Sequence, residues 1–176
     1  MKNLKGKVAI VTGSSSGVGA ATARLFASLG CHVVINYNAN SAGAEQVMQD
    51  CEALGVETLC FGGSVANDSD CEAMVRAAME KWGRVDILVN NAGTTKFVDH
   101  NKLDGLDAED FQRIYGVNVI GCYQMTRAVR AAMEANDEGG AIVNIASTAA
   151  ITGIGSSIAY AASKGAMVTM TLSLAR

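Results

Sequence analysis

Tyr160 and Lys164 form the pair best suited to proton transfer in this sequence of 176 residues. On a helix, residues i and i+4 share a face, so the Lys164 ammonium can lie near the Tyr160 phenol. A nearby positive charge favours the phenolate and lowers a pKa that is ordinarily about 10. Tyr160 could then serve as a general acid or base near neutral pH. The same spacing also occurs by chance on solvated helix faces, but the small residues around this pair favour close packing.

Two further polar residues could serve the same chemistry. Ser147 stands 13 positions before Tyr160, at the end of a predicted strand, where its hydroxyl could hold a substrate oxygen. Asn118 falls in a row at helical spacing that is otherwise mainly apolar: Phe111, Ile114, Tyr115, Asn118, Cys122 and Met125. A polar group there needs hydrogen-bond partners. It could bond a neighbouring backbone carbonyl in a purely structural role, or order a water or a backbone segment leading to Lys164, and the sequence leaves both open.

A glycine-rich turn, Thr-Gly-Ser-Ser-Ser-Gly-Val-Gly at residues 12–19, follows the first predicted strand and opens a helix. Glycine permits positive φ and a close approach of the backbone to a ligand, and the N–H groups of a helix start attract a pyrophosphate. A merely tight turn would need only one or two glycines at no particular spacing, so we favour nucleotide binding. The expected contacts are Gly13, Ser15, Ser16, Gly17, Val18 and Gly19.

The elements that position these residues alternate along the whole chain, short β-branched runs with helical patterns, as in a parallel sheet with helices on its faces. Strands are predicted at residues 7–12, 32–37, 56–61, 85–90 and 141–146, each almost continuously apolar as if buried on both faces. Ala21, Leu25 and Leu29 mark one face of the first predicted helix. The second predicted helix repeats apolar residues at Ala44, Val47, Met48, Cys51 and Leu54. The fold class is therefore α/β.

Whole-chain properties narrow the function further. A hydrophobic fraction of 49% with 18% charged residues supports one well-packed domain over residues 1–176. A net charge of -3 argues against a nucleic-acid partner. The five cysteines are odd in number and lack a CxxC pair, so neither disulfides nor a metal site is predicted. The apolar run at residues 8–11 is too short for a signal peptide or membrane span, and we expect a cytoplasmic protein without membrane contact.

Taken together, these motifs resemble the short-chain dehydrogenase/reductase family, in its TGxxxGxG subgroup, from Lys7 to the end of the chain. The matching pieces are residues 12–19, the Asn-Asn-Ala-Gly stretch at 90–93, Asn118, Ser147 and Tyr160-x-x-x-Lys164. The resemblance implies a doubly wound (Rossmann) sheet with strand order 3-2-1-4-5. It also implies reversible hydride transfer between NAD(P)H and a small carbonyl or alcohol substrate. The NAD-using epimerases and dehydratases that share Tyr-x-x-x-Lys are disfavoured by their different glycine spacing.

The resemblance also implies a role for each catalytic candidate. Tyr160 would be the proton donor or acceptor, and Lys164 would lower its pKa and bind the nicotinamide ribose. Ser147 would orient the substrate carbonyl, and Asn118 would support a proton relay. Within the family, residues 33–38 are similar to those of 3-oxoacyl-carrier-protein reductases and bacterial glucose dehydrogenases.

Cofactor preference is read at the end of the second predicted strand. An acidic residue there would bond the ribose hydroxyls of NAD and repel the 2′-phosphate of NADP. This chain has Tyr37, flanked by Asn36 and Asn38, so that electrostatic barrier is absent and we expect NADP(H) to be favoured over NAD(H). Ser16, where NADP-preferring members often carry a basic residue, argues the other way.

The adenosine side of the cofactor involves two further turns, by resemblance. Asn91, Ala92 and Gly93 would line it. Ser64 and Val65 stand where the family usually has Asp-Val against adenine. A hydroxyl can still bond the adenine amino group, but with less strength than a carboxylate.

Family members typically extend further, with later strands and a substrate-covering segment, so we expect this chain to lack a C-terminal part. Strand five would then be an open edge, and turnover by the 176-residue chain would be weak or absent. A non-catalytic nucleotide-binding or interaction module is the alternative. Family members are often dimers or tetramers through two long helices, here residues 107–135 and from 157 onward, so homo-oligomerisation is expected by resemblance.

Overall fold

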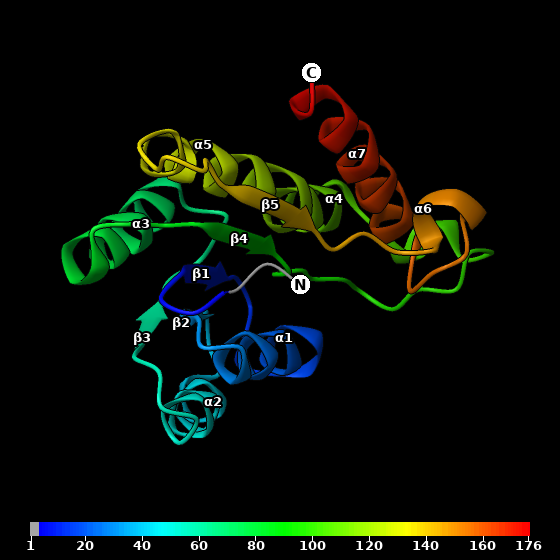
Figure 1. Ribbon diagram of the computed structural model, residues 1–176. Helices are drawn as coiled ribbons and strands as arrows, with labels where there is room; N and C mark the ends of the chain where they lie inside the picture. The colour runs from blue at the N-terminus through cyan, green and yellow to red at the C-terminus, as the bar shows by residue number, and fades with distance from the viewer. Residues whose placement is uncertain (1–3) are drawn as a thin grey trace.

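The apolar runs at the predicted strand positions all form strands of one parallel sheet (Figure 1). The computed structural model describes residues 4–176. The strands are β1 (Val8–Val11), β2 (His32–Tyr37), β3 (Thr58–Gly62), β4 (Ile87–Asn90) and β5 (Ala141–Asn144). Their order is β3-β2-β1-β4-β5, which confirms the predicted doubly wound sheet.

The order reverses between β1 and β4, which lie side by side although the whole β2–β3 half separates them in sequence. Val8 of β1 is in register with His32 of β2, and Ala9 is in register with Ile87 of β4. In open α/β sheets, ligands bind outside the carboxyl ends of the strands at such a switch point. The glycine-rich turn after β1 and the turn after β4 therefore meet where a ligand is expected.

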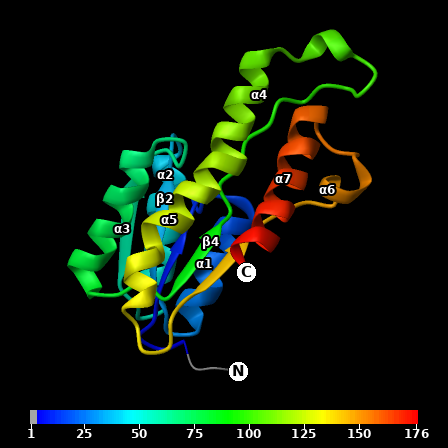
Figure 2. The ribbon, with the colours of Figure 1, turned by 90° about the horizontal axis from the view of Figure 1, so that it is seen from above.

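Helices cover both faces of the sheet (Figure 1). On one face lie α1 (Gly17–Ser28) and α2 (Ser41–Glu52), and on the other lie α3 (Asp68–Trp82), α5 (Cys122–Glu134) and α7 (Ile158–Leu174). The remaining elements are η1 (Leu103–Gly105), α4 (Ala108–Tyr115), the π-helical η2 (Gly116–Gly121) and α6 (Ala149–Thr152). Figure 2 shows α4, η2 and α5 running as one long helix. Among residues 4–176, no helix combines the length and apolar character needed to cross a membrane.

The face that α1 buries is the one carrying alanines instead of the one marked by leucines. Ala20, Ala23 and Ala27 are buried against the sheet, whereas Leu25 and Leu29 are 59% and 40% exposed. Small side chains let α1 lie close to strands whose own residues, valine and isoleucine, already fill the interface. The size of the apolar side chains alone would therefore identify the wrong face of α1 as the buried one.

Two other apolar residues are more exposed than their spacing predicts. Leu54 lies beyond the end of α2, and Phe111 points outward from α4. Asn118, in contrast, is fully buried in the same row as Phe111. The rest of that row is buried or half-buried, including Ile114, Cys122 and Met125, although the π-helical η2 interrupts the regular 3.6-residue repeat within it.

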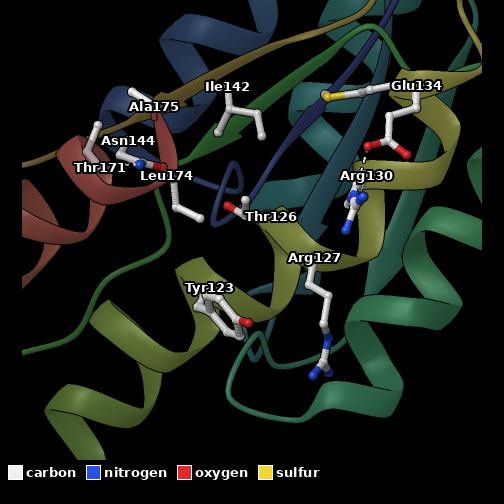
Figure 3. A pocket seen from close by; sticks show the side chains of 11 residues that line it. Tyr123, Thr126, Arg127, Arg130, Glu134, Ile142, Asn144, Thr171, Leu174 and Ala175 are labelled. Atoms are coloured by element: carbon white, nitrogen blue, oxygen red, sulfur yellow. Dashed lines mark hydrogen bonds and ion pairs between the residues drawn. The ribbon is translucent and has the colours of Figure 1, made fainter.

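The outermost strand β5 is an exposed edge, which corrects the expectation that it is buried on both faces. Ile142 and Val143 are 40% and 47% exposed. The side of β5 that carries Ile142 faces a cavity of about 470 Å³ between α5 and α7 (Figure 3). Tyr123 and Leu174 also line this cavity. The open edge itself agrees with the prediction.

At the amino end of the central strands, a buried carboxylate joins β1 to β4. Asp86 accepts hydrogen bonds from the Val8 amide at 2.9 Å and from two nitrogens of Arg84 at 2.6 and 2.8 Å. Lys7 lies 3.3 Å away. Burial alone would raise the pKa of the Asp86 carboxyl, but the hydrogen bonds outweigh burial and hold the pKa below its ordinary value.

We therefore expect Asp86→Asn to lower the free energy of unfolding at pH 7 by about 2 kcal/mol, because charged hydrogen bonds at a buried site are lost. A carboxyl with a depressed folded-state pKa stabilises the fold above its unfolded pKa of about 3.9, and this stability is lost as pH falls through the folded-state pKa. Chemical denaturation at several pH values should show the difference shrinking in acid. The exposed Arg130–Glu134 pair supplies a control, since Glu134→Gln should cost less than about 1 kcal/mol. Equal losses of unfolding free energy in Asp86→Asn and Glu134→Gln would contradict the stabilising role of the buried Asp86 carboxylate.

Candidate functional site

A cavity of about 550 Å³ opens where β1, β2, β3 and β4 end, and we name it the strand-end cavity. Its volume lies in the range of small-molecule sites. The lining residues are Gly13, Ser15, Ser16, Asn36, Tyr37, Asn38, Ala39, Asn40, Gly63, Ser64, Val65, Asn91, Ala92, Gly93, Thr94, Arg113 and Val117. Most residues predicted to contact a nucleotide therefore lie around one cavity. Gly17, Val18 and Gly19 lie outside this lining, in the first turn of α1.

Two glycines of the turn after β1 are required by protein packing. A Cβ at Gly13 would lie 2.8 Å from Cα of Ala92, and φ at Gly13 is +63°. A Cβ at Gly19 would lie 2.6 Å from the carbonyl oxygen of Gly13 and still closer to Asn91 Nδ2. At Gly17, with φ of +55°, a Cβ would meet nothing within 4 Å. Only Gly17 therefore presents open backbone at the start of α1, which is where a ligand could approach.

Thr12 and Asn91 join the turn after β1 to the turn after β4. Thr12 Oγ1 accepts from the Asn91 and Ala92 amides, both at 3.0 Å. Asn91 Nδ2 donates to the carbonyl oxygens of Thr12 at 2.9 Å and Gly13 at 3.1 Å. These four bonds fix the floor of the strand-end cavity. The Asn91 amide group is thus occupied by backbone, although its sequence position predicts a cofactor contact.

The first turn of α1 presents a positive end to the cavity. Ser16 is the N-cap, its side chain makes no capping bond, and the first turn contains no acidic residue. The helix dipole and free N–H groups at such an end attract an anion. The serine hydroxyls at Ser15 and Ser16 line the cavity beside it, whereas Ser14 is buried and donates to Val11 O at 2.7 Å. The anion-binding part of the turn is therefore Ser15–Ser16–Gly17 and the helix start.

The end of β2 places two neighbouring residues in different surroundings. Asn36 is buried, its Oδ1 accepts from the Gly13 amide at 3.0 Å, and its Nδ2 donates to Gly63 O at 3.0 Å. Tyr37 packs its phenol over Gly62, where a Cβ would lie 2.9 Å from the hydroxyl. All three residues, Asn36, Tyr37 and Asn38, line the cavity, and the Asn36 side chain also ties adjacent turns together.

The turn after β3 is held by an acidic residue in the first turn of α3. Asp70 Oδ2 accepts from the Ser64 amide at 2.9 Å. The Ser64 hydroxyl accepts from the Ala66 amide at 3.3 Å, a long bond that leaves its own O–H available. Val65 is buried beneath it, with its carbonyl oxygen bonded by Gln124 at 2.7 Å.

A second cavity, of about 300 Å³, contains the tyrosine-lysine pair, and we name it the tyrosine cavity. It is lined by Val18, Asn91, Gly93, Thr94, Thr95, Ile145, Ala146, Tyr160 and Lys164. Asn91, Gly93 and Thr94 also line the strand-end cavity, so the two cavities share a wall. A molecule extending from one to the other would pass along this wall.

Lys164 and Tyr160 lie together near the start of α7. Lys164 Nζ is 5.8 Å from the centroid of the Tyr160 ring and donates to Ile145 O at 2.7 Å. Lys164 is 3% exposed, and this burial lowers its pKa because the ammonium loses hydration. The predicted proximity of the two side chains is therefore present, and the lysine is held by the end of β5.

Asn118 bonds the backbone at the shared wall. Its Oδ1 accepts from the Thr94 amide at 2.8 Å, and its Nδ2 donates to Thr94 O at 3.1 Å and to Ser163 Oγ at 2.9 Å. A Cβ at Gly93 would lie 3.5 Å from Asn118 Oδ1 and 3.8 Å from Lys164 Nζ. The Asn118 side chain thus orders the backbone at Thr94, beside Lys164, by bonding both its N–H and its C=O.

Among the described residues, neither Asn118 nor Ser147 lines the two cavities, but Asn118 bonds their shared wall, whereas the bonds of Ser147 lie in the turn that opens α6. The Ser147 hydroxyl accepts from the Ala149 amide at 3.2 Å, and its carbonyl oxygen accepts from Ala150. These bonds serve the turn that opens α6.

Sequence reasoning missed three residues of this site. Thr12 is quoted in the turn motif without a role, Thr94 directly follows the Asn-Ala-Gly stretch, and Arg113 lies a turn and a half before Asn118 on the same long helix. Among the described residues that line the strand-end cavity, Arg113 carries the only charge. Only adjacency to the known motifs could have suggested Thr94 and Arg113. In residues 4–176 no cluster of His, Cys, Asp or Glu suits a metal ion.

Comparison with known proteins adds independent information. The family model for short chain dehydrogenase matches residues 7–176. A 3-oxoacyl-[acyl-carrier-protein] reductase of Synechocystis is 34% identical over the full chain and 70% of its own length. A putative short-chain dehydrogenase/reductase from Burkholderia xenovorans superposes with a TM-score of 0.94 at 46% identity, over 97% of this chain and 71% of that one. An NAD+-bound xylitol dehydrogenase superposes with a TM-score of 0.88 at 30% identity, over 97% and 64%.

This chain therefore spans 64% to 71% of the length of these three proteins. The matched region contains the strand-end cavity and the tyrosine cavity in full.

Replacing two helical glycines by alanine should change the free energy of unfolding in opposite directions. Gly19→Ala should lower the free energy of unfolding by about 1–3 kcal/mol, because the methyl group overlaps Gly13 and Asn91. Gly165→Ala in α7 meets only Ala150 O at 3.7 Å and should raise it by up to about 1 kcal/mol through helix propensity. Denaturant titration of both variants measures this, and a Gly19→Ala protein as stable as the wild type would refute the packing argument.

Proposed function

This chain belongs to the short chain dehydrogenase family, and on that premise we propose that it is an NAD(P)(H)-dependent oxidoreductase. Its reaction would be reversible hydride transfer between the nicotinamide and a carbonyl or alcohol carbon. The observation that carries the proposal is the shared wall, because it connects the cavity of the Tyr160–Lys164 pair to the cavity of about 550 Å³ at the strand ends.

The residues present fit a dinucleotide. The uncapped start of α1 with open backbone at Gly17 suits the pyrophosphate, and Val65 with the 91–93 turn suits the adenosine part. Lys164 would hold the nicotinamide ribose. When bound, the nicotinamide supplies or accepts the hydride.

The proton chemistry would belong to Tyr160. In the reductive direction its phenol donates a proton to the substrate oxygen, and Lys164 places a positive charge beside the phenolate that forms. Asn118 holds the Thr94 backbone and thus the wall on which the substrate and nicotinamide meet. Ser147 would orient the substrate carbonyl by donating its O–H, which the bond accepted from the Ala149 amide leaves available.

The substrate class is a small molecule with a carbonyl or alcohol group. Two matched proteins are named for such groups, one as a 3-oxoacyl-[acyl-carrier-protein] reductase and one as a xylitol dehydrogenase. Their difference leaves the particular substrate of this chain open.

A homo-oligomer, dimer or tetramer, would form through the long helices. Exposed apolar side chains on them support this assembly, among them Ile120 and Leu172.

Replacing the phenol separates catalysis from binding. Tyr160→Phe should reduce turnover by about 100-fold or more, because the proton donor is lost, while the dissociation constant for NADPH stays within about twofold. Turnover should be assayed over a carbonyl panel, in the 176-residue chain and in any longer product of the same gene. Tyr123→Phe removes an exposed phenol of α5 and serves as the control. Equal turnover in wild type and Tyr160→Phe would refute the catalytic assignment, and cofactor binding without any turnover would favour the nucleotide-binding module.

Tyr37 predicts the cofactor preference, NADP(H) over NAD(H). A carboxylate at this position would repel the 2′-phosphate, so Tyr37→Asp should weaken NADPH binding by about tenfold relative to NADH. Fluorescence titration of both reduced cofactors measures this ratio. Tyr37→Asn, which changes size without adding charge, should leave the ratio near that of the wild type. A wild-type protein that binds NADH more tightly would contradict the preference.

A further inference from the structure

The segment after Gly93 is attached to the start of α4 by an ionic cluster. Asp110 Oδ2 bonds Lys96 Nζ at 2.5 Å, and Asp110 Oδ1 pairs with Arg113 Nη2 at 3.4 Å. Arg113 uses its other terminal nitrogen, Nη1, to donate to Thr94 Oγ1 at 3.1 Å. Asp110 thus holds Lys96 directly and reaches Thr94 through Arg113.

Helix capping accounts for only part of what Asp110 does. Asp107 Oδ1 accepts from the Asp110 amide at 2.8 Å, and Asp110 Oδ2 accepts from the Asp107 amide at 3.3 Å, which forms a capping box. A cap needs no cation, yet Asp110 is buried between Lys96 and Arg113. The Lys96 hydrogen bond holds the pKa of Asp110 below its ordinary value, against the opposing effect of burial.

The segment so attached contributes Thr94 to the wall shared by the two cavities. Thr94 lines both of them. Asn118 holds its amide and carbonyl, and Arg113 holds its hydroxyl. Because Asp110 orients Arg113, the position of this wall depends on a carboxylate that lines neither cavity.

The far end of residues 94–98 is attached to the start of α7, and Figure 2 shows this segment beside the chain that leads from α6 to α7. Thr95 Oγ1 and Ser156 Oγ are 2.5 Å apart, and the Val98 amide donates to Ser156 O at 2.9 Å. The next residue, Ser157, is the N-cap of α7 and accepts from the Tyr160 amide at 3.3 Å. The segment therefore bridges the α4 ionic cluster and the helix that carries Tyr160.

We propose that Asp110 is a positioning residue for cofactor binding, which fixes the wall between the strand-end and tyrosine cavities by holding Lys96 and Arg113 against α4. The inference rests on the proposed function, because it names the dinucleotide as the ligand of the strand-end cavity. A change at Asp110 should weaken cofactor binding although Asp110 does not touch the cofactor.

The test compares two aspartate-to-asparagine variants of the same chain. Asp110→Asn keeps an oxygen that can accept from Asp107 but loses the charge that holds Lys96 and Arg113. Asp50→Asn removes an Asp–Arg pair away from both cavities, Arg24–Asp50 at 2.7 Å between α1 and α2. NADPH titration should give a dissociation constant raised about threefold to tenfold in Asp110→Asn and changed less than twofold in Asp50→Asn. Hydrogen exchange of residues 94–98 in free protein should accelerate only in Asp110→Asn.

A second pair of variants distinguishes a specific effect on cofactor binding from a general loss of stability. Thr94→Val removes the hydroxyl that Arg113 bonds, and Thr94→Ser retains it. Weaker NADPH binding in Thr94→Val with recovery in Thr94→Ser, and a less than additive effect of combining Thr94→Val with Asp110→Asn, would support the proposal. Unchanged exchange at residues 94–98 in Asp110→Asn, or wild-type NADPH affinity in that variant, would overturn it. Absence of NADPH binding by the wild type would instead count against the proposed function, and the exchange result would still decide whether Asp110 holds the wall.

Discussion

The contact between the turns that follow β1 and β4 is the constraint on which the rest of the site depends. The two strands are neighbours only because the order of the sheet reverses there, and each ends in a turn whose backbone N–H and C=O groups need partners. Thr12 and Asn91 satisfy those groups across the junction, at distances of 2.9–3.1 Å. Gly13 and Gly19 are needed because any side chain would separate the turns. The cavity floor and the position of α1 both follow from this junction.

The reactive pair depends on a second junction, between β5 and α7. Burying the Lys164 ammonium is unfavourable by itself, and its bond to Ile145 O, just beyond β5, offsets part of that cost. Asn118 adds a third element, because its side chain bonds both the Thr94 backbone and Ser163 of α7. Its location in a π-helical turn agrees with the frequent use of such turns at functional sites. Three segments far apart in sequence therefore meet at one wall.

Patterns in the sequence predicted the positions of the strands well and the burial of individual side chains less well. All five strands appear at the expected positions, because continuous β-branched runs flanked by glycine have few alternatives. The buried face of α1 differs from the leucine-marked one, since packing distance favours alanine over larger side chains there. β5 is as apolar as the other strands, yet its side chains are exposed, because their exposure depends on what packs against the faces of the strand, and a cavity lies beside Ile142.

By itself, the sequence determined the α/β class, the strand positions, the glycine turn and the candidate residues, because these follow from local periodicity, composition and short spacings. Tertiary structure alone decided which side chains face a cavity. Asn36 and Asn91 bond backbone, Ser147 serves the turn before α6, and Arg113 lines the strand-end cavity beside Thr94. The physical reason is that a polar side chain bonds whichever partner the fold brings within about 3 Å, and such partners lie many residues away in sequence.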